Sequence, residues 1–535
     1  MRSLFADTFL LVRFTLRRDR VWLLSWMIGV IGFVLFCVPL LQNMLGTPEE
    51  LLVMGQMMEN PAMVAMVGPV FDTQNYTMGA MYANMMLVLM VSLAGAMNII
   101  FVTRHTRQDE ELGRYEVIRS LPVGRLAPLT ATLLVAFAFN MVMALAVGFG
   151  MPLFGIDSMV LPDTLLFGAA MGATGFVFAA ITAIFCQLVS SNRTASGLSL
   201  LSLMFAYALR AAGDVGGMEA LVLLSPAGLA SRTQVFVTNQ VWPIWALLGT
   251  ALACTLLAMA LNERRDLEQG MIPARPGKKH GGLLLKSPLG LALRLMRTMC
   301  LVWCGVLMTF GVMYGSVLNE VQGFIEGSEW LQAIFAGTDG QSVTDQFVAI
   351  LMVIMSIMAA VPTIGLMLRL RSEEKQGFTE QVLGTPVSRV KLFGVYLGVA
   401  FGLSIVFQVL AAASFWGAAS VVMDPVPAFS TYLQSALNYL PAIWVFLGLT
   451  AFLIGFLPNL TALSYGYLGV SFFVIYIGTV AGFPEWTQNL SPFGVVPQVP
   501  LEAQTWMPLF VLCSIAVLLS LVGVAGYRRR DLRAG

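Results

Sequence analysis

Charged residues with a fixed spacing occur in two copies of one polar pattern. Residues 107–125 read RQDEELGRYEVIRSLPVGR, and residues 371–389 read RSEEKQGFTEQVLGTPVSR. Their shared positions are Arg107, Glu110, Gly113, Glu116, Pro122 and Arg125 in the first copy, and Arg371, Glu374, Gly377, Glu380, Pro386 and Arg389 in the second. Carboxylate and guanidinium groups form charge-assisted hydrogen bonds. A single copy would be interpreted as a solvated connector, but a connector has no need to keep Gly and both Glu in register.

The composition of the remaining chain excludes an ordinary soluble protein. Of the 535 residues, 58% are hydrophobic and 11% are charged, whereas soluble domains carry about 25% charged residues. Apolar runs long enough to cross a bilayer, which takes roughly 20 helical residues, recur along the chain. They predict an all-α polytopic membrane protein with about twelve transmembrane helices. The predicted spans are 21–43, 79–103, 126–152, 164–190, 195–213, 240–261, 299–318, 346–368, 392–420, 433–457, 461–483 and 506–527.

The distribution of charge orients these spans, because short cytoplasmic loops are rich in Lys and Arg. With both termini inside, only Arg210 and Arg232 of the 30 Lys and Arg residues fall on the outer side, together with sixteen of the 29 acidic residues. A basic stretch containing Arg13, Arg17 and Arg18 precedes the first span, and no small-x-small cleavage site follows it. This pattern predicts a retained span after an interfacial helix, with both termini cytoplasmic.

Other landmarks also repeat. NRTA at 192–195 matches NLTA at 459–462, SPAG at 225–228 matches SPFG at 491–494, and RRDL at 264–267 matches RRDL at 529–532. The sequence therefore predicts two six-span halves, 1–262 and 286–535, joined by a basic cytoplasmic linker at 263–285. An even number of spans returns each copy to the same membrane side, so the two six-helix repeats are expected to be parallel.

Both copies of the polar pattern lie between the second and third spans of a half, on the predicted cytoplasmic side. Helix-favouring residues predict a short helical rod at 108–121 and another at 372–385, each of about 14 residues and roughly 20 Å. Pro122 and Pro386 are expected to end these rods, because the residue before a proline is disfavoured in the α conformation.

The stretch EEKQGFTEQVLGTPVSR, with its Glu, Gly, Glu and T-P-V-S-R ending, resembles the cytoplasmic coupling helix of the type-2 family of ABC exporter permeases. The six-span module, the interfacial helix and the polar segment between spans five and six also resemble that family. The resemblance implies a permease in a bacterial cytoplasmic (inner) membrane, driven by two copies of a separate nucleotide-binding ATPase. Fused permeases of this kind resemble the membrane subunits of exporters for polyketide antibiotics such as tetronasin.

The same resemblance implies a role for the shared residues of both patterns, which would form the surface that contacts the ATPase. Gly113 and Gly377 would permit close backbone approach, and the glutamates would meet basic or amide groups of the partner. Reversing the charge of Glu110 and Glu374 is therefore expected to uncouple ATP hydrolysis from transport and to leave the fold intact. The first copy departs from the family with SLPVGR at its end, so the two docking segments are expected to be unequal.

A secondary transporter of the major facilitator kind is the alternative, since it also has two six-span halves. Such carriers usually need ionisable groups within the membrane, but the predicted spans hold only Arg210, at an outer end. The G-x-x-x-D-R-x-G-R-R pattern of those carriers does not occur, and neither does the phosphate-binding pattern G-x-x-x-x-G-K-[ST]. We therefore expect no cofactor on this chain, with ATP and Mg bound by the partner ATPase.

A membrane enzyme is a third class to consider. Its site would need clustered carboxylates, histidines or an activated nucleophile. The two histidines, His105 and His280, are predicted to be cytoplasmic and isolated, and the six cysteines lie in or beside apolar spans. The sequence therefore predicts no catalytic or metal site.

The cargo is expected to be lipophilic or amphipathic, such as an antibiotic or drug, because 33 Met and 35 Phe residues favour an apolar, adaptable pathway. The family resemblance places spans two and five of each half along it, which implies Asn84, Asn98, Phe205, Tyr207, Tyr465, Phe472 and Tyr476. Ordinary packing or a lipid-facing position is the alternative for each. SPAG and SPFG resemble external re-entrant elements, or are ordinary turns. The expected partners are the ATPase pair, the lipid bilayer and a small lipophilic substrate, with no nucleic acid.

Overall fold

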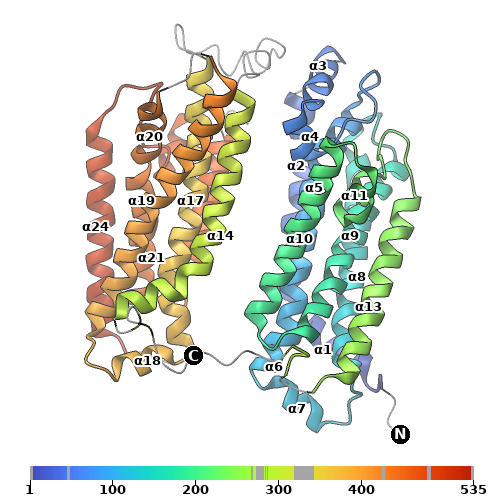
Figure 1. Ribbon diagram of the computed structural model, residues 1–535, viewed down its shortest axis with the longest axis horizontal. Helices are drawn as coiled ribbons and strands as arrows, with labels where there is room; N and C mark the ends of the chain where they lie inside the picture. The colour runs from blue at the N-terminus through green and yellow to red at the C-terminus, as the bar shows by residue number, and fades with distance from the viewer. Residues whose placement is uncertain are drawn as a thin grey trace. The chain divides into compact units, whose positions relative to one another are not determined.

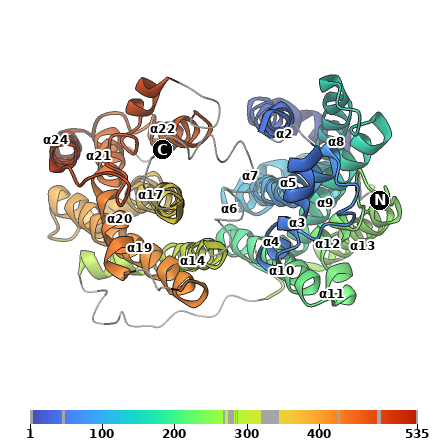
Figure 2. The ribbon, with the colours of Figure 1, turned by 90° about the horizontal axis from the view of Figure 1, so that it is seen from above.

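The structure is a computed structural model of the chain, and it describes residues 4–44, 48–266, 269–272, 282, 285, 287–318, 343–424, 428–478 and 484–531. All regular elements in this part of the chain are helical. They divide into two compact units, Met1–Gly277 and Lys278–Gly535, each with a large hydrophobic core. Figure 1 shows the helices of each unit coloured along the chain, and Figure 2 shows them from above.

Unit 1 is a bundle around helix α9. Its long helices are α2 (Arg20–Met44), α5 (Met78–Thr103), α8 (Ala127–Gly150), α9 (Leu161–Leu188), α10 (Asn192–Val215) and α13 (Trp242–Arg264). Its shorter helices are α1 (Thr8–Arg18), α3 (Pro48–Met58), α4 (Pro61–Val67), α11 (Glu219–Leu224) and α12 (Pro226–Ser231). Helix α9 packs against α5, α8, α10 and α13, which surround it in Figure 2. The basic stretch before the first span forms α1, as predicted.

Unit 2 is built from α14 (Pro288–Val317), α17 (Val343–Lys375), α19 (Arg389–Val422), α20 (Phe429–Asn438), α21 (Leu440–Phe456), α22 (Leu463–Phe472) and α24 (Trp506–Arg529). The π-helical turn η5 (Phe473–Ile477) continues α22, and the short 3₁₀ helix η6 (Glu485–Leu490) precedes α24. Helix α19 packs along α14 and α17, and α21 packs along α24.

The helices match the predicted spans closely. Eleven helical segments in the described parts of the chain are long and apolar enough to cross a membrane, which confirms an all-α polytopic membrane protein. The predicted span 461–483 corresponds to the shorter apolar helix Leu463–Tyr476, and residues 479–483 lie outside the described residues. The predicted span 433–457 is divided into α20 and α21.

Small residues allow the helices of each unit to approach closely. A Cβ atom at Gly168 of α9 would lie 2.1 Å from the carbonyl oxygen of Ala144 in α8, and one at Gly455 of α21 would lie 2.3 Å from the carbonyl oxygen of Gly523 in α24. In a bilayer, where apolar burial between helices gains little, such close packing holds helices together. These contacts therefore fix the frame that carries the polar ends of both units.

Candidate functional site

The two polar patterns have the same backbone path. In unit 1, α5 continues through the π-helical turn η1 (Arg104–Gln108) into α6 (Asp109–Glu111), and α7 (Arg114–Ser120) follows after Gly113. In unit 2, α17 continues to Lys375, and α18 (Phe378–Leu383) follows after Gly377. The prediction of one rod at 108–121 and another at 372–385 is therefore wrong. In each unit, the pattern forms the extended end of a long membrane helix, which a sharp turn joins to a separate short helix.

A glycine with positive φ makes each corner. Gly113 has a φ of 70° and Gly377 a φ of 75°, and no atom lies within 4 Å of a Cβ built on either residue. The left-handed conformation is open to glycine without the clash that a Cβ causes with the following carbonyl. The structure thus gives a local reason for both glycines, different from the close approach to a partner that the resemblance implied. Both helices stop before proline, as expected, and Leu121 before Pro122 is extended.

We expect Gly113→Ala and Gly377→Ala each to lower the free energy of unfolding by ~1–2 kcal/mol, the usual penalty of an L side chain in this conformation. Thermal unfolding of the detergent-solubilised chain measures the loss. Gly29→Ala in α2 is the matched control, because it lies in regular helix with nothing within 4 Å of its Cβ and should cause no loss. Equal stability of all three variants would contradict the corner role.

Glu110 lies in a buried clamp at the end of unit 1. Its carboxylate is 2.9 Å from Nη1 of Arg107, one turn earlier, and accepts two hydrogen bonds of 3.1 and 3.0 Å from Arg265, just beyond α13. The side chains of Arg107, Glu110 and Arg265 are 1%, 4% and 7% exposed. Arg125 donates to the carbonyl oxygen of Arg265 over 2.7 Å. The clamp therefore ties the extension of α5 to the end of α13.

Unit 2 has a clamp of the same composition. The Glu374 carboxylate is 3.1 Å from Nη1 of Arg371 and 2.5 Å from Nη2 of Arg530, just beyond α24. Arg389 donates to the carbonyl oxygen of Arg530 over 2.8 Å. Arg265 and Arg530 are the second residues of the two RRDL motifs. The sequence offered these motifs as landmarks, but their part in the clamps was not predicted.

Burial separates the candidate contact residues into two groups. Arg107, Glu110, Arg371 and Glu374 are buried within their own units, so the prediction that Glu110 and Glu374 meet basic groups of a partner does not fit the structure. Glu116 on α7 and Glu380 on α18 are exposed, as are Pro122 and Pro386. Large apolar side chains are exposed beside them, namely Leu112, Val117 and Leu121 in unit 1 and Phe378 in unit 2. The exposed surface of the two patterns is consequently α7 and α18.

A second charged cluster lies beside the clamp of unit 1. His105 is buried, with Nε2 at 2.6 Å from the Asp19 carboxylate and Nδ1 at 2.9 Å from the carbonyl oxygen of Phe101. Asp19 separates α1 from α2 and also accepts from Arg18 and Arg104. The prediction that His105 is isolated is wrong. The cluster links the junction of α1 and α2 to the extension of α5, which the spacing along the chain could not indicate.

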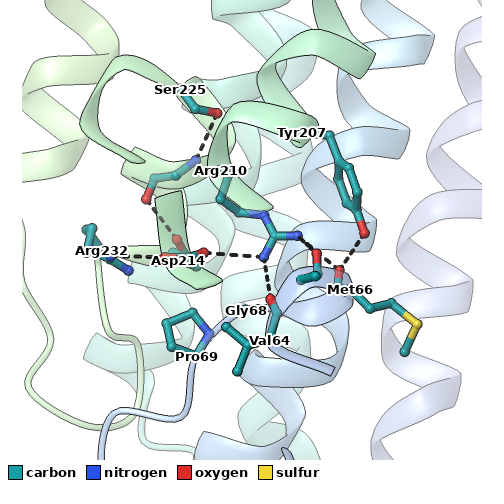
Figure 3. Close-up of polar contacts among 12 residues, drawn as sticks. Val64, Met66, Gly68, Pro69, Tyr207, Arg210, Asp214, Ser225 and Arg232 are labelled. Carbon is teal, nitrogen blue, oxygen red and sulfur yellow. Dashed lines mark hydrogen bonds and ion pairs between the residues drawn. The ribbon is translucent and has the colours of Figure 1, made fainter. Parts of the chain in front are cut away.

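At the opposite end of unit 1, Arg210 of α10 is fully buried and caps the end of α4 (Figure 3). Its guanidinium donates to the carbonyl oxygens of Val64, Ala65 and Met66 over 3.3, 2.6 and 3.1 Å, and it lies 4.8 Å over the Tyr207 ring. The last carbonyls of a helix have no partner within the helix, and a cation there complements the helix dipole. Arg210 thus has a specific structural partner.

Arg210 is also the first residue of an ion-pair chain that runs through Asp214 to Arg232 (Figure 3). The Asp214 carboxylate is 3.5 Å from Arg210 and 3.0 Å from Arg232, and Arg232 is 2.8 Å from Glu219 at the start of α11. The hydrogen bond from Arg232 lowers the pKa of Glu219, so this contact stabilises the fold at neutral pH and is lost as the pH falls through that lowered pKa. This ion-pair chain connects α10 with the segment that holds α11 and α12.

The SPAG and SPFG segments differ in structure. In unit 1, Ser225 caps α12 through the amide of Gly228 and donates a 2.6 Å hydrogen bond to the carbonyl oxygen of Ala206 in α10. In unit 2, the SPFG residues follow η6 as a turn, and Ser491 accepts from the amide of Phe493. The unit 1 segment is therefore a packed pair of short helices against α10, and the unit 2 segment is a turn.

Two predicted pathway residues have internal partners. Asn98 of α5 is fully buried and exchanges hydrogen bonds of 3.0 and 2.8 Å with Asn140 of α8. Asn84 donates to the carbonyl oxygens of Gly68 and Pro69 and lies in a small pocket at the end of α5. Asn98 therefore joins two helices within unit 1, and its place in the pathway stays a prediction.

The aromatic pathway candidates lie on the surfaces of their units. Phe205, Tyr465, Phe472 and Tyr476 are 64%, 38%, 40% and 43% exposed, and Phe472 stacks on Tyr476 with ring centroids 5.5 Å apart. Tyr207 differs, because its hydroxyl donates to the carbonyl oxygen of Met66 over 2.7 Å. The exposed aromatic residues remain predictions for the pathway.

No group of three His, Cys, Asp or Glu residues suited to a metal ion occurs among the described residues. The six cysteines are all unpaired by disulfides. The charged residues that the structure brings together form ion pairs and helix caps at the ends of the transmembrane helices. These polar contacts tie the ends of neighbouring helices to one another.

Comparison with known proteins identifies the family. The profile of the family described as "Multidrug efflux system permease Rv1217c, C-terminal domain" matches residues 12–261 and 285–528. The multidrug efflux system permease protein Rv1217c of Mycobacterium tuberculosis (strain ATCC 25618 / H37Rv) is 33% identical over 541 residues, covering 99% of this chain and 96% of the relative. The chain therefore belongs to the Rv1217c family of multidrug efflux permeases.

Proposed function

We propose that the chain is the permease of an ATP-driven exporter of the ABC type, and that it moves a lipophilic or amphipathic compound such as an antibiotic or drug out of a bacterial cell. Two copies of a separate ATPase subunit bind ATP and Mg and dock on α7 and α18. Both termini lie in the cytoplasm, and the two units are duplicated six-span halves. Membership of a multidrug efflux permease family supports the class of cargo.

The observation that carries this proposal is the clamp that occurs in both units. Glu110 joins the extension of α5 to the end of α13, and Glu374 joins the extension of α17 to the end of α24. A force applied to α7 or α18 is therefore transmitted to two membrane helices of a unit, and not only to the loop. Closure of the ATPase pair would move the helices of each unit together and open the route outward.

Charge placement favours ATP as the energy source over an ion gradient. Ion-coupled carriers use ionisable groups inside the membrane. In the described spans, the buried acids lie at helix ends and are already paired with arginine, namely Asp19, Asp109, Glu110, Asp214, Glu373 and Glu374. These acids have a structural role. In the described spans, no carboxylate lies midway along a membrane helix, where a driving ion would bind.

The test is purification of the chain from its native membrane in mild detergent, followed by transport in vesicles. We expect two ATPase subunits to co-purify with each chain, and cargo to accumulate only with ATP. A chain that purifies alone and transports without ATP would instead be a secondary carrier.

We expect Val117→Asp and Phe378→Asp together to reduce ATPase co-purification on the order of thirtyfold, the effect of losing about 2 kcal/mol at buried apolar anchors. Both side chains are exposed, at 68% and 46%, so the variant should fold normally. Val160→Asp, at the opposite end of unit 1 and 51% exposed, is the matched control and should keep the partner. Undiminished co-purification of the double variant would exclude α7 and α18 as the docking surface.

A further inference from the structure

Unit 2 contains a groove at the break in its fourth membrane helix. Helix α20 ends at Asn438 and α21 begins at Leu440, with Pro441 in the first turn of α21. Proline has no N–H to donate, and its ring clashes with the carbonyl four residues earlier, so it interrupts a helix. The groove lies between α20, this first turn and the start of α24. Its volume is about 510 Å³, which suits a small molecule.

Part of the groove lining is polar. Asn438 and Gln504 exchange hydrogen bonds of 2.7 and 3.0 Å, and Asn438 also donates to the carbonyl oxygen of Pro497. Ser430 and Gln434 of α20 line the groove as well, and Trp506 marks the start of α24. An amide oxygen has two lone pairs, so each amide of the Asn438 and Gln504 pair can accept a further hydrogen bond without separating.

The rest of the groove lining is apolar. It is lined by Leu433, Leu437, Trp444, Leu509 and Phe510. The walls belong to the candidate membrane spans Phe429–Phe456 and Trp506–Arg529. The amide pair lies at the break in the first of these spans and just before the start of the second. Trp444, Leu509 and Phe510 lie further along α21 and α24.

We propose that this groove binds an uncharged amphipathic small molecule that enters from the bilayer. A hydroxyl or carbonyl of the ligand meets Asn438 and Gln504, and its hydrocarbon part lies against Leu433, Trp444 and Phe510. The described residues that line the groove include no charged side chain, and an unpaired buried charge is costly. This favours an uncharged ligand over the anionic head of a phospholipid. The inference rests on the proposed function in assigning the ligand to the class of exported compounds.

Unit 1 supplies an internal control, because it has a groove among α8, α9 and α13. Its lining is apolar except for Asn140, and that amide is engaged by Asn98. Helix α9 is continuous there, without the break that brings amides into the groove of unit 2. A hydrocarbon chain fits this groove, but it offers a ligand hydroxyl no comparable partner.

The experiment is photolabelling of the purified chain in lipid nanodiscs, without ATPase or nucleotide. The probe is an octanol derivative that carries a diazirine, and mass spectrometry maps the modified peptides. Leu433→Trp fills the groove, with Leu521→Trp on the exposed face of α24 as the matched control. Ser430→Trp at the exposed mouth replaces the first variant if that one does not fold.

We expect adducts to gather on residues 430–444 and 504–513 and to be about tenfold fewer when tryptophan occupies the groove. Unlabelled octanol should compete, and Leu521→Trp should change nothing. Equal labelling of the groove in unit 1, insensitivity to the filling variants, or competition by added phosphatidylglycerol alone would overturn the proposal. Because labelling needs no ATP, its failure is distinct from a failure of ATP-driven export, which the vesicle assay measures separately.

Discussion

Glu110→Lys is expected to destabilise unit 1 severely. The new ammonium group would lie against Arg107 and Arg265, whose side chains are only 1% and 7% exposed. Breaking a buried ion pair by removing one partner costs ~3–5 kcal/mol, because a charge remains buried without compensation, and a third cation adds repulsion. The apparent unfolding temperature of the detergent-solubilised chain should fall on the order of 10 °C. Glu374→Lys should act in the same way on unit 2.

Exposed charge on the same segment provides the control for this prediction. Glu116→Lys on α7 should change the free energy of unfolding by less than about 0.5 kcal/mol, as surface substitutions usually do. Glu110→Gln should lie between the two, because it keeps a hydrogen-bond acceptor but removes the charge. A Glu110→Lys chain as stable as the Glu116→Lys chain would show that the clamp contributes little.

This result also changes how the docking proposal is tested. The sequence led us to expect that reversing Glu110 and Glu374 would uncouple ATP hydrolysis and spare the fold. Their burial means that loss of transport in that variant would report on folding as much as on docking. The exposed Val117 and Phe378 separate the two effects, since neither supports the core.

Much of the fold followed from hydropathy, because a bilayer requires each span to be a long apolar helix with its backbone hydrogen bonds satisfied internally. The two polar patterns were also recognisable, and their equal spacing corresponds to equal corners at Gly113 and Gly377. The predicted rod failed because helix propensity describes each residue alone. A single glycine in the left-handed conformation turned the chain at a point where its neighbours all favour helix.

The partners of the buried charges were harder to predict, because they depend on contacts distant in sequence. Arg265 reaches Glu110 across 155 residues, and Asp19 reaches His105 across 86. Two signals in the sequence pointed to the clamps: the Arg and Glu three residues apart in each polar pattern, and the recurrence of RRDL. Asp214 lies one helical turn after Arg210 and could have been proposed as its partner, but the carbonyls at the end of α4 could not.

The second large effect is expected at Arg210. Arg210→Met should lower the free energy of unfolding by ~3–5 kcal/mol, because it leaves the buried Asp214 short of one cation and removes the donors that satisfy the end of α4. Met nearly preserves the apolar stem of the side chain, so the loss measures the guanidinium. Arg210→Lys should recover only a part of this free energy. A single ammonium group lacks the planar fork of a guanidinium, so it cannot reach the carbonyls of Ala65 and Met66 together with Asp214.

Arg193 on the same helix provides the comparison, because its side chain is exposed near the start of α10. Arg193→Met should leave the unfolding temperature nearly unchanged. Proteolysis of the folded chain adds a local readout, because α4 loses its cap in Arg210→Met and the segment around Val64 should be cleaved faster than in Arg193→Met. If both variants unfold alike and the cleavage rates agree, then Arg210 does not hold α4. The ion-pair chain through Asp214 and Arg232 would then stabilise only the α11 and α12 segment.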